Sequence, residues 1–309
     1  MNVLPFPGSP APDRSGRGPA YTVAQVIDRF LRHAAKDAAP RTQETRERVL
    51  GLFRAAFGSK LLGDCIPADL DGWIDDHAEW ASNWTKRRNI AYVQSAFNWA
   101  ARMRLIRENP FRGVTRRKGK RGRPATEAEW RTLLRATTAP FRRVLFFLAL
   151  TGCRPGEAAA LKWEQVNLDS GVAVLEDHKS SRTRSDPTPR IIVLPPVLVR
   201  LLRWLRRRQP TAEYVLLHYR NGPWNRYSLS CRMKRLRRTC GLPAECKLYG
   251  LRHGFGTKAV INGVDLKTLS VLMGHASTQM TEYYTHLAGQ LEHLRAAAKR
   301  ATHSPPPAR

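Results

Sequence analysis

Several features that define other classes of protein are scarce or missing in this chain. Its five cysteines are scattered and include no C-x-x-C pair, so a disulfide framework is not expected and the thiols should be reduced. The longest wholly apolar run, from Val144 to Leu150, is far shorter than the roughly 20 residues that a membrane span needs. The first twenty residues contain no apolar stretch suited to a secretory signal. We expect a soluble, cytoplasmic protein that does not bind a membrane.

Acidic residues are also scarce. The chain has 25 Asp and Glu against 53 Lys and Arg, a formal net charge of +28, which predicts a polyanionic partner, nucleic acid first. A generic basic protein with a solvated positive face is the alternative, although the charge is clustered. The sequence has no G-x-x-x-x-G-K loop, no H-E-x-x-H motif and no clustered carboxylates. Neither ATP nor a catalytic metal is therefore expected, and we predict no cofactor.

Four helices without a strand pattern predict a small α domain over residues 21–112, after a disordered tail over residues 1–20. The first begins at a capping box formed by Thr22 and Gln25, and the fourth extends from Trp84 to Ile106. Three basic residues near the start of the fourth helix are candidates for DNA binding: Lys86, Arg87 and Arg88.

A basic linker is predicted over residues 113–125. It contains the run RRKGKRGR, whose glycines and charges do not favour packing but suit a chain that follows a phosphate backbone. A nuclear-localisation signal or a merely solvated run is the alternative. The candidate DNA-binding residues of the linker are Arg116, Arg117, Lys118, Lys120, Arg121 and Arg123.

A second domain is predicted over residues 126–298, followed by a short tail over residues 299–309. Thr126 and Glu129 form a capping box that opens its first helix. Segments 172–175 and 190–194 are predicted strands of a small antiparallel sheet, joined by a long connection. The remaining pattern is helical, including helices predicted over 252–262 and 265–273 and a last one from about residue 281. The fold class is mainly α with a small antiparallel sheet.

Three motifs carry the chemistry: TGCRPGEAAALKW, YGLRHGFGT and LMGHASTQMTEYYTHL. The first displays Arg154 at a helix N-terminus, where backbone donors also favour anions. Arg252 lies in the second motif, and an arginine fork matches phosphate oxygens bidentately at any working pH. A tyrosine from the third, Tyr284 or its neighbour Tyr283, could become the covalent partner of phosphorus.

With these motifs in this order, the chain resembles the tyrosine recombinase (phage integrase) family of site-specific DNA recombinases, from about Tyr21 to Leu294. The resemblance implies a four-helix, SAM-like core-binding domain and an α+β catalytic domain. It also implies that Arg154 and Arg252 clamp the scissile phosphate and that His275 donates to it. Lys179 would protonate the leaving 5′-oxygen. Tyr284, nine residues after His275, would be the nucleophile.

Several of these residues also have a simpler structural interpretation. Arg154 could cap a helix and pair with Glu157, a loop lysine such as Lys179 is usually solvated, and a histidine after glycine is often a turn residue. Two further arginines of the strand connection would contact DNA only if that connection enters a groove: Arg182 and Arg184.

The chain departs from the family at one position, because Tyr249 stands three residues before Arg252 where most members have histidine. Neutral tyrosine is a poor base but both donates and accepts hydrogen bonds. Ionising the nucleophile at pH 7 costs on the order of 4 kcal/mol, so a proton acceptor matters. Water and His253 are the alternatives to Tyr249 as the acceptor of this proton.

The nucleophile has two candidates next to each other in the sequence. Adjacent helical positions differ by about 100° in direction, so only one of Tyr283 and Tyr284 can face the phosphate.

We therefore predict an enzyme that cuts and rejoins double-stranded DNA at specific sites through a 3′-phosphotyrosyl intermediate. The resemblance implies a tetramer on two DNA sites, and integration of a phage or other mobile element is the favoured setting. A type IB topoisomerase-like enzyme, which nicks and reseals one duplex, is one alternative. A DNA-binding regulator that kept the fold but lost catalysis is the other.

Overall fold

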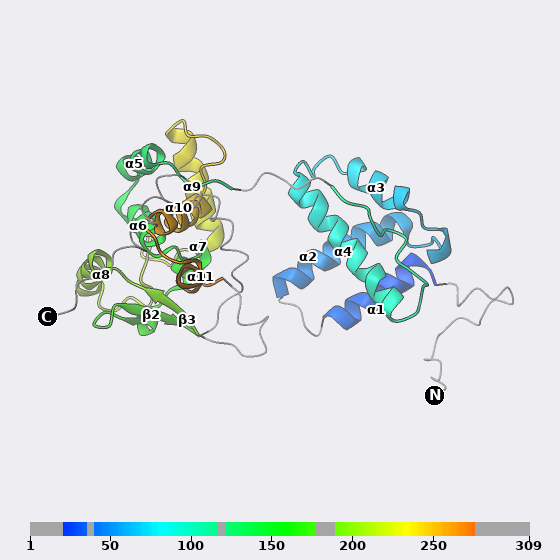
Figure 1. Ribbon diagram of the computed structural model, residues 1–309, viewed down its shortest axis with the longest axis horizontal. Helices are drawn as coiled ribbons and strands as arrows, with labels where there is room; N and C mark the ends of the chain where they lie inside the picture. Colours follow the sequence, from blue (N-terminus) through cyan, green and yellow to red (C-terminus); the bar gives the residue numbers. More distant parts are fainter. Residues whose placement is uncertain (1–20, 36–39, 117–121, 177–188, 276–309) are drawn as a thin grey trace, which may run out of the picture. The chain divides into compact units, whose positions relative to one another are not determined.

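A computed structural model of the protein describes residues 21–35, 40–116, 122–176 and 189–275 (Figure 1). The chain divides into two compact units, one up to residue 120 and one from residue 121. Both units are mostly helical, and a three-stranded antiparallel sheet lies in the second. The predicted fold class is confirmed.

Where the structure describes the first unit, it has four α-helices and a short 3-10 turn: α1 (Val23–Ala34), α2 (Pro40–Phe57), η1 (Leu62–Asp64), α3 (Pro67–Asp76) and α4 (Asn83–Arg102). The predicted capping box opens α1, where the Thr22 hydroxyl accepts from the Gln25 backbone and the Gln25 side chain accepts from the Thr22 backbone. Helices α1, α2 and α4 pack on one another around an aromatic cluster that includes Phe53, Phe97 and Phe111.

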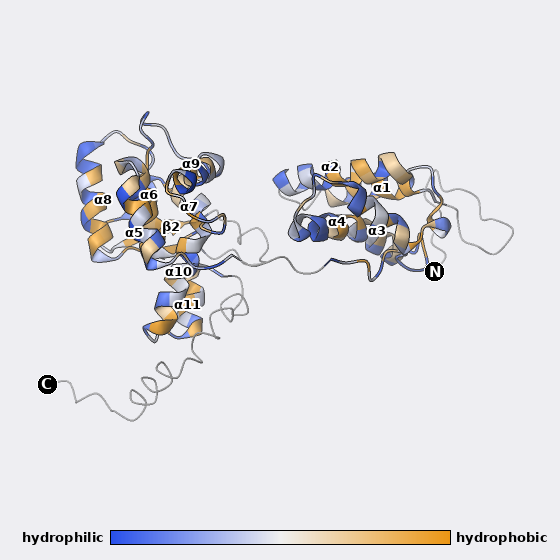
Figure 2. Cartoon of the chain, turned by 90° about the horizontal axis from the view of Figure 1, so that it is seen from above, coloured by the Kyte–Doolittle hydropathy of each residue, from blue (hydrophilic) through white to orange (hydrophobic). Residues whose placement is uncertain are grey.

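The second unit contains the helices α5 (Glu127–Ala136), α6 (Ala139–Thr151), α7 (Pro155–Ala160), α8 (Pro196–Arg208), α9 (Arg226–Thr239), α10 (Leu248–Ile261) and α11 (Leu266–Met273), with a 3-10 turn η2 (Trp163–Gln165). The predicted capping box of Thr126 and Glu129 opens α5. Figure 2 shows hydrophobic and hydrophilic positions alternating along α8, which buries Leu198, Leu202 and Leu205 and ends in three arginines.

The sheet has the strand order β1 (Val166–Asn167), β2 (Val172–Leu175) and β3 (Arg190–Val193). Strands β2 and β3 are the predicted pair, in the register Ala173 opposite Ile192 and Leu175 opposite Arg190. Side chains alternate between a buried and an exposed face, as the period of a strand requires. The buried face of the sheet thus includes one charged residue, Arg190.

Helix α10 packs along α6 in the centre of the second unit, and α11 lies beside both α10 and β3 (Figure 1). The close approach depends on Gly152, which ends α6 in the left-handed conformation at φ 62°. A Cβ atom at this position would lie 2.4 Å from Cδ1 of Phe255 on α10. Glycine is therefore required for the conformation and for the packing.

Two helix boundaries differ by several residues from the sequence prediction. α4 ends at Arg102 rather than Ile106. α10 begins at Leu248, so Arg252 lies in its second turn and not at its start. All five cysteines are unpaired. Within the described ranges, no helix has both the length and the apolar character of a membrane span.

Candidate functional site

Arg154 is the N-cap residue of α7, as the TGCRPGE motif predicts, since Gly152 ends one helix and Pro155 begins the next. Its Nη1 atom donates to Oε1 of Glu157 at 2.7 Å, and its backbone N donates to Oε2 of the same carboxylate at 2.8 Å. Its Nη2 atom donates to the carbonyl oxygen of Gly274 at 2.8 Å. Arg154 therefore forms an ion pair with Glu157, and the same guanidinium also contacts the turn that precedes His275.

Arg252 projects from α10 into the same region and is only 4% exposed. Its Nη1 atom donates to the carbonyl oxygen of Gly152 at 2.6 Å. Burial lowers the pKa of the Arg252 guanidinium, and the positive charge of Arg154 lowers that pKa further. The two arginines, far apart in the sequence, are thus close enough to repel each other.

A third guanidinium, that of Arg190, reaches this cluster from β3, and its pKa is also lowered by burial. Glu157 is an acidic neighbour of Arg154, Arg190 and Arg252. Three positive charges around one carboxylate leave an excess of positive charge, and a buried charge is costly unless it is compensated. The cluster is therefore suited to bind an anion such as a phosphate.

His275 follows the left-handed Gly274 that ends α11, and its backbone N donates to the carbonyl oxygen of Ser270 at 2.9 Å. The residue is buried. Burial, followed by the charges of Arg252 and Arg154, lowers the pKa of His275 to about 4. The imidazole is consequently neutral at pH 7 and can donate one hydrogen bond to an oxygen without carrying charge.

Tyr249 occupies the first turn of α10, three residues before Arg252 and therefore on a neighbouring part of the helix surface. Its side chain is 42% exposed. His253 is half-buried beside Gly122, and burial and Arg252 lower the pKa of its imidazole. The side chain of Tyr249 is thus accessible to a large ligand. The side chain of His253 instead lies against Gly122, at the start of the second unit.

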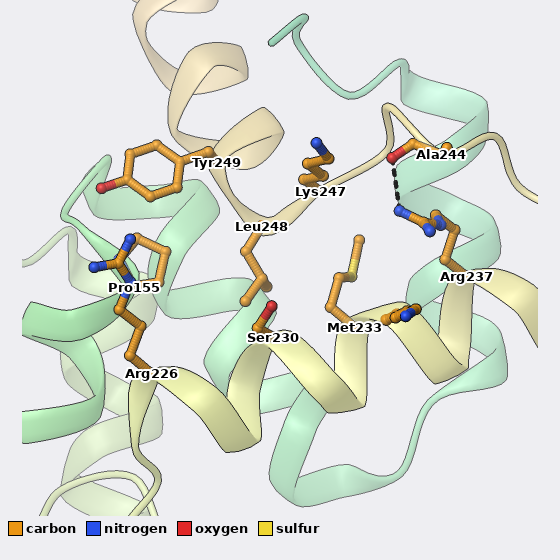
Figure 3. A pocket seen from close by; sticks show the side chains of 10 residues that line it. Pro155, Arg226, Ser230, Met233, Arg237, Ala244, Lys247, Leu248 and Tyr249 are labelled. Carbon is orange, nitrogen blue, oxygen red and sulfur yellow. Dashed lines mark hydrogen bonds between the residues drawn. The ribbon is translucent and has the colours of Figure 1, made fainter. Parts of the chain in front are cut away.

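A pocket of about 460 Å³ lies beside Tyr249, between α9 and the start of α10 (Figure 3). Figure 3 shows the side chains of Tyr249 and Arg226 on one side of this pocket, near Pro155. The basic residues that line it are Arg226, Lys234, Arg237 and Lys247. None of these four lies in the motifs or basic runs that the sequence singles out, although three of them recur at helical spacing on one face of α9.

The basic residues predicted to bind DNA in the first unit are partly engaged in ion pairs. Nζ of Lys86 lies 2.7 Å from Oδ1 of Asp75, and Arg116 pairs with both Asp71 and Asp75. Arg87 donates to the backbone oxygen of Arg116 at 2.8 Å. These contacts hold Arg116, which lies in the predicted linker, on the first unit.

Two further candidates make different contacts. The guanidinium of Arg88 lies over the ring of Trp84, 5.1 Å from its centroid. Arg123, near the other end of the predicted linker, makes a forked pair with the carboxylate of Glu129. This pair lowers the pKa of Glu129 to about 2.

The structure thus brings together Arg154, Arg252 and His275, with Tyr249 nearby. The other predicted site residues lie outside the described residues: Tyr284 and its competitor Tyr283, Lys179, Arg117, Lys118, Lys120, Arg121, Arg182 and Arg184.

A family model, described as the phage integrase family, matches residues 125–290. The chain belongs to this family, the tyrosine recombinases. It is therefore a DNA strand-transferring enzyme. The recombinase is 31% identical to tyrosine recombinase XerA of Pyrococcus furiosus over 163 residues, which cover 52% of the chain and 54% of XerA. It is 27% identical to tyrosine recombinase XerC of Alcanivorax borkumensis over 294 residues, 89% of the chain and 92% of XerC.

Solved structures of integrases share the fold of this recombinase. The Tn1549 transposon integrase, in complex with transposon right end DNA, gives a TM-score of 0.74 at 20% identity and covers 91% of this chain and 100% of that chain. The lambda integrase dimer bound to a COC′ core site gives a TM-score of 0.71 at 17% identity, covering 88% and 79% of the two chains.

Proposed function

We propose that this recombinase cuts and rejoins double-stranded DNA at specific sites, with Tyr284 as nucleophile and Arg154, Arg252 and His275 as the phosphate site. The observation that carries the proposal is the meeting of two guanidiniums and a neutral imidazole around the Gly152 and Gly274 turns. Donors aimed at a developing oxyanion in a buried site stabilise its transition state strongly.

The proposed reaction is a transesterification at phosphorus. The Tyr284 oxygen forms a bond to phosphorus while the bond from phosphorus to the 5′-oxygen breaks, leaving a 3′-phosphotyrosyl link. Lys179 gives a proton to the departing 5′-oxygen. The phenolic proton passes to water or to His253, and Tyr249 hydrogen-bonds the phosphate or the nucleophile. Attack by a 5′-hydroxyl of a partner strand reverses these steps and releases Tyr284.

The basic face of α9 supports a further part of the proposal. Arg226, Lys234 and Arg237, together with Lys247, lie next to Tyr249 and would contact the phosphates flanking the cleaved linkage. The remaining DNA contacts are proposed for Lys86, Arg87, Arg88, Arg182, Arg184 and the basic residues of the linker. Binding should weaken steeply with salt, because neutralised phosphates release their counterions.

Strand exchange between two sites calls for several protomers, and we propose a tetramer on two DNA sites. The lambda integrase tetramer bound to a Holliday junction is a structural neighbour that supports this assembly. We further propose that the recombinase acts in the cytoplasm on the DNA of a phage or other mobile element. Sequencing the DNA that flanks its gene tests this setting, since the proposal predicts direct repeats or element boundaries there.

The covalent step can be tested with a nicked suicide substrate. A duplex is selected from a random-sequence library by binding to the protein, and nicks are then placed at each position along one strand. Tyr284→Phe should abolish the covalent adduct on a denaturing gel, whereas Tyr283→Phe should retain it. The reverse result would assign the nucleophile to Tyr283.

Two other outcomes would replace the proposed function. Relaxation of any supercoiled plasmid without exchange between sites would indicate a topoisomerase-like enzyme. Sequence-specific binding without an adduct under any condition would indicate a regulator.

A further inference from the structure

Arg190 is a charged residue where the strand pattern places an apolar one. It begins β3, lies opposite Leu175 on the inner face of the sheet and is 4% exposed, like Ile192 two positions later. A buried guanidinium is costly unless its donors are satisfied. The contacts of Arg190 should therefore reveal what the position does.

Two of its hydrogen bonds go to the end of α11 and a third to its own strand, while Nε has no hydrogen-bond partner among the described residues. Nη1 donates to the carbonyl oxygen of Val271 at 2.9 Å and to that of Ile191 at 2.6 Å, and Nη2 donates to that of Leu272 at 2.5 Å. The last four carbonyls of a helix have no partner within it, and a cation at this end also complements the helix dipole. Arg190 thus caps α11 from a different secondary-structure element.

The turn that follows α11 fits closely against this side chain. Gly274 is left-handed at φ 64°, and a Cβ atom there would lie 2.4 Å from Nε of Arg190. On the other side, the Gly274 carbonyl oxygen accepts from Nη2 of Arg154. Two guanidiniums, one from β3 and one from the cap of α7, therefore hold the turn that delivers His275.

In the sequence, Arg190 and its contacts lie next to two segments that carry predicted site residues. Residues 177–188, which include Lys179, end just before β3, and residues 276–309, which include Tyr284, begin just after His275. Because Arg190 joins β3 to the end of α11, it fixes the start of β3 relative to His275. A shift of this contact would move His275 relative to Arg154 and would also move the points from which both segments leave the fold.

We propose that Arg190 is a positioning residue for strand transfer, which holds the Gly274 turn so that His275 and Arg154 are aligned on one phosphate. This inference rests on the proposed function. Arg190 acts through His275 and the turn, and it is not proposed to touch the DNA. Misplacement of reacting groups by about 1 Å can cost about 100-fold in rate, so the effect should fall on the covalent step and not on DNA affinity.

The test compares three variants with the wild-type protein on the nicked, library-selected duplex. Arg190→Gln removes the fork, and Arg190→Lys keeps one cationic donor. Arg203→Gln is the matched control, because Arg203 also donates to a backbone carbonyl, that of Leu168, but from a side chain that is 52% exposed. DNA affinity, the single-turnover rate of adduct formation and the melting of each variant are measured together.

We expect Arg190→Gln to bind the duplex with unchanged affinity but to form the adduct about 100-fold more slowly. Arg190→Lys should recover part of that rate, to roughly tenfold below the wild type, because an ammonium can reach one carbonyl but cannot form the fork. Arg203→Gln should match the wild type. The NMR-measured pKa of His275 should rise in Arg190→Gln, since a neighbouring positive charge is lost.

Three results would overturn the inference: a wild-type rate in folded Arg190→Gln, a loss of rate that only follows lost DNA affinity, or unfolding of both Arg190 variants at the assay temperature. The last would make Arg190 a structural cap alone. Absence of an adduct from the wild-type protein would instead refute the proposed function, and the role given to Arg190 would fall with it.

Discussion

Replacing Gly152 by alanine should destabilise the second unit and separate Arg252 from its anchor. The left-handed conformation costs a residue with a Cβ atom about 1–2 kcal/mol. The added methyl group would lie 2.4 Å from the ring of Phe255, and such overpacking costs about 1–3 kcal/mol more. The expected loss in the free energy of unfolding is therefore roughly 2–5 kcal/mol. Because the Gly152 carbonyl accepts from Arg252, adduct formation should also slow.

Calorimetry and urea denaturation of the full chain would measure this loss, with the first unit as an internal reference. Gly156→Ala is the matched control, since a Cβ atom there meets nothing within 4 Å. Because Gly156 lies in a helix, its replacement by alanine should raise the free energy of unfolding by up to about 1 kcal/mol. A Gly152→Ala protein as stable as the wild type, with an unchanged rate of adduct formation, would refute the reasoning.

Three further predictions concern individual side chains. Lys179→Ala should slow DNA cleavage, because the departing 5′-oxygen then lacks its proton donor. A substrate with sulfur in place of the bridging 5′-oxygen should restore the rate, because a thiolate leaves without a proton. If this substrate does not restore the rate, Lys179 is not the general acid. Glu129→Gln should lower the free energy of unfolding by about 2 kcal/mol in urea denaturation, because it removes the charge of a buried carboxylate that pairs with a partly exposed Arg123. Exposed Glu127→Gln should change this free energy by less than about 1 kcal/mol, and equal effects of the two substitutions would contradict the reasoning. The pKa of His275 is lowered in the folded protein, so the imidazole of the unfolded chain takes up a proton at a higher pH than the folded one does. The stability that the neutral imidazole confers is therefore lost as the pH falls from about 6.5 to about 4. Over that range the wild type should lose about 3 kcal/mol more than His275→Gln, and parallel pH curves would show that the imidazole is not buried as described.

Local signals in the sequence predicted much of the fold. The capping boxes at Thr22 and Thr126 mark true helix starts, because a side-chain acceptor and its backbone donor are only three residues apart. Alternating apolar residues likewise predicted β2 and β3. β1 consists of Val166 and Asn167, which is too short for any period to be visible.

Features that depend on tertiary packing were not predictable in this way. Helix α10 begins four residues earlier than the sequence predicts, since glycines at 250, 254 and 256 weaken the helical pattern that contacts with α6 stabilise. The sequence does not indicate Arg190 as part of the site, because an arginine in a strand normally occupies an exposed position. Only the packing of β3 against the end of α11 gives that guanidinium its partners.

The order of Arg154, Arg252, His275 and Tyr284 along the chain came from the resemblance to the family. Their separations of up to about 130 residues carry no geometric information until the fold is known. The structure supplies the meeting of the first three around two glycine turns. It also supplies the basic pocket beside Tyr249, which neither spacing nor resemblance had selected.

The central claim is that a phenolic oxygen of this chain becomes bonded to DNA phosphorus. Peptide mapping of the trapped adduct by mass spectrometry tests it most directly, because residues 268–295 form one tryptic peptide that contains both neighbouring tyrosines. Fragment ions should place the phosphonucleotide on Tyr284 and leave Tyr283 unmodified. A nucleotide attached to any other residue, or no covalent product from a duplex that the protein binds and nicks, would contradict the account.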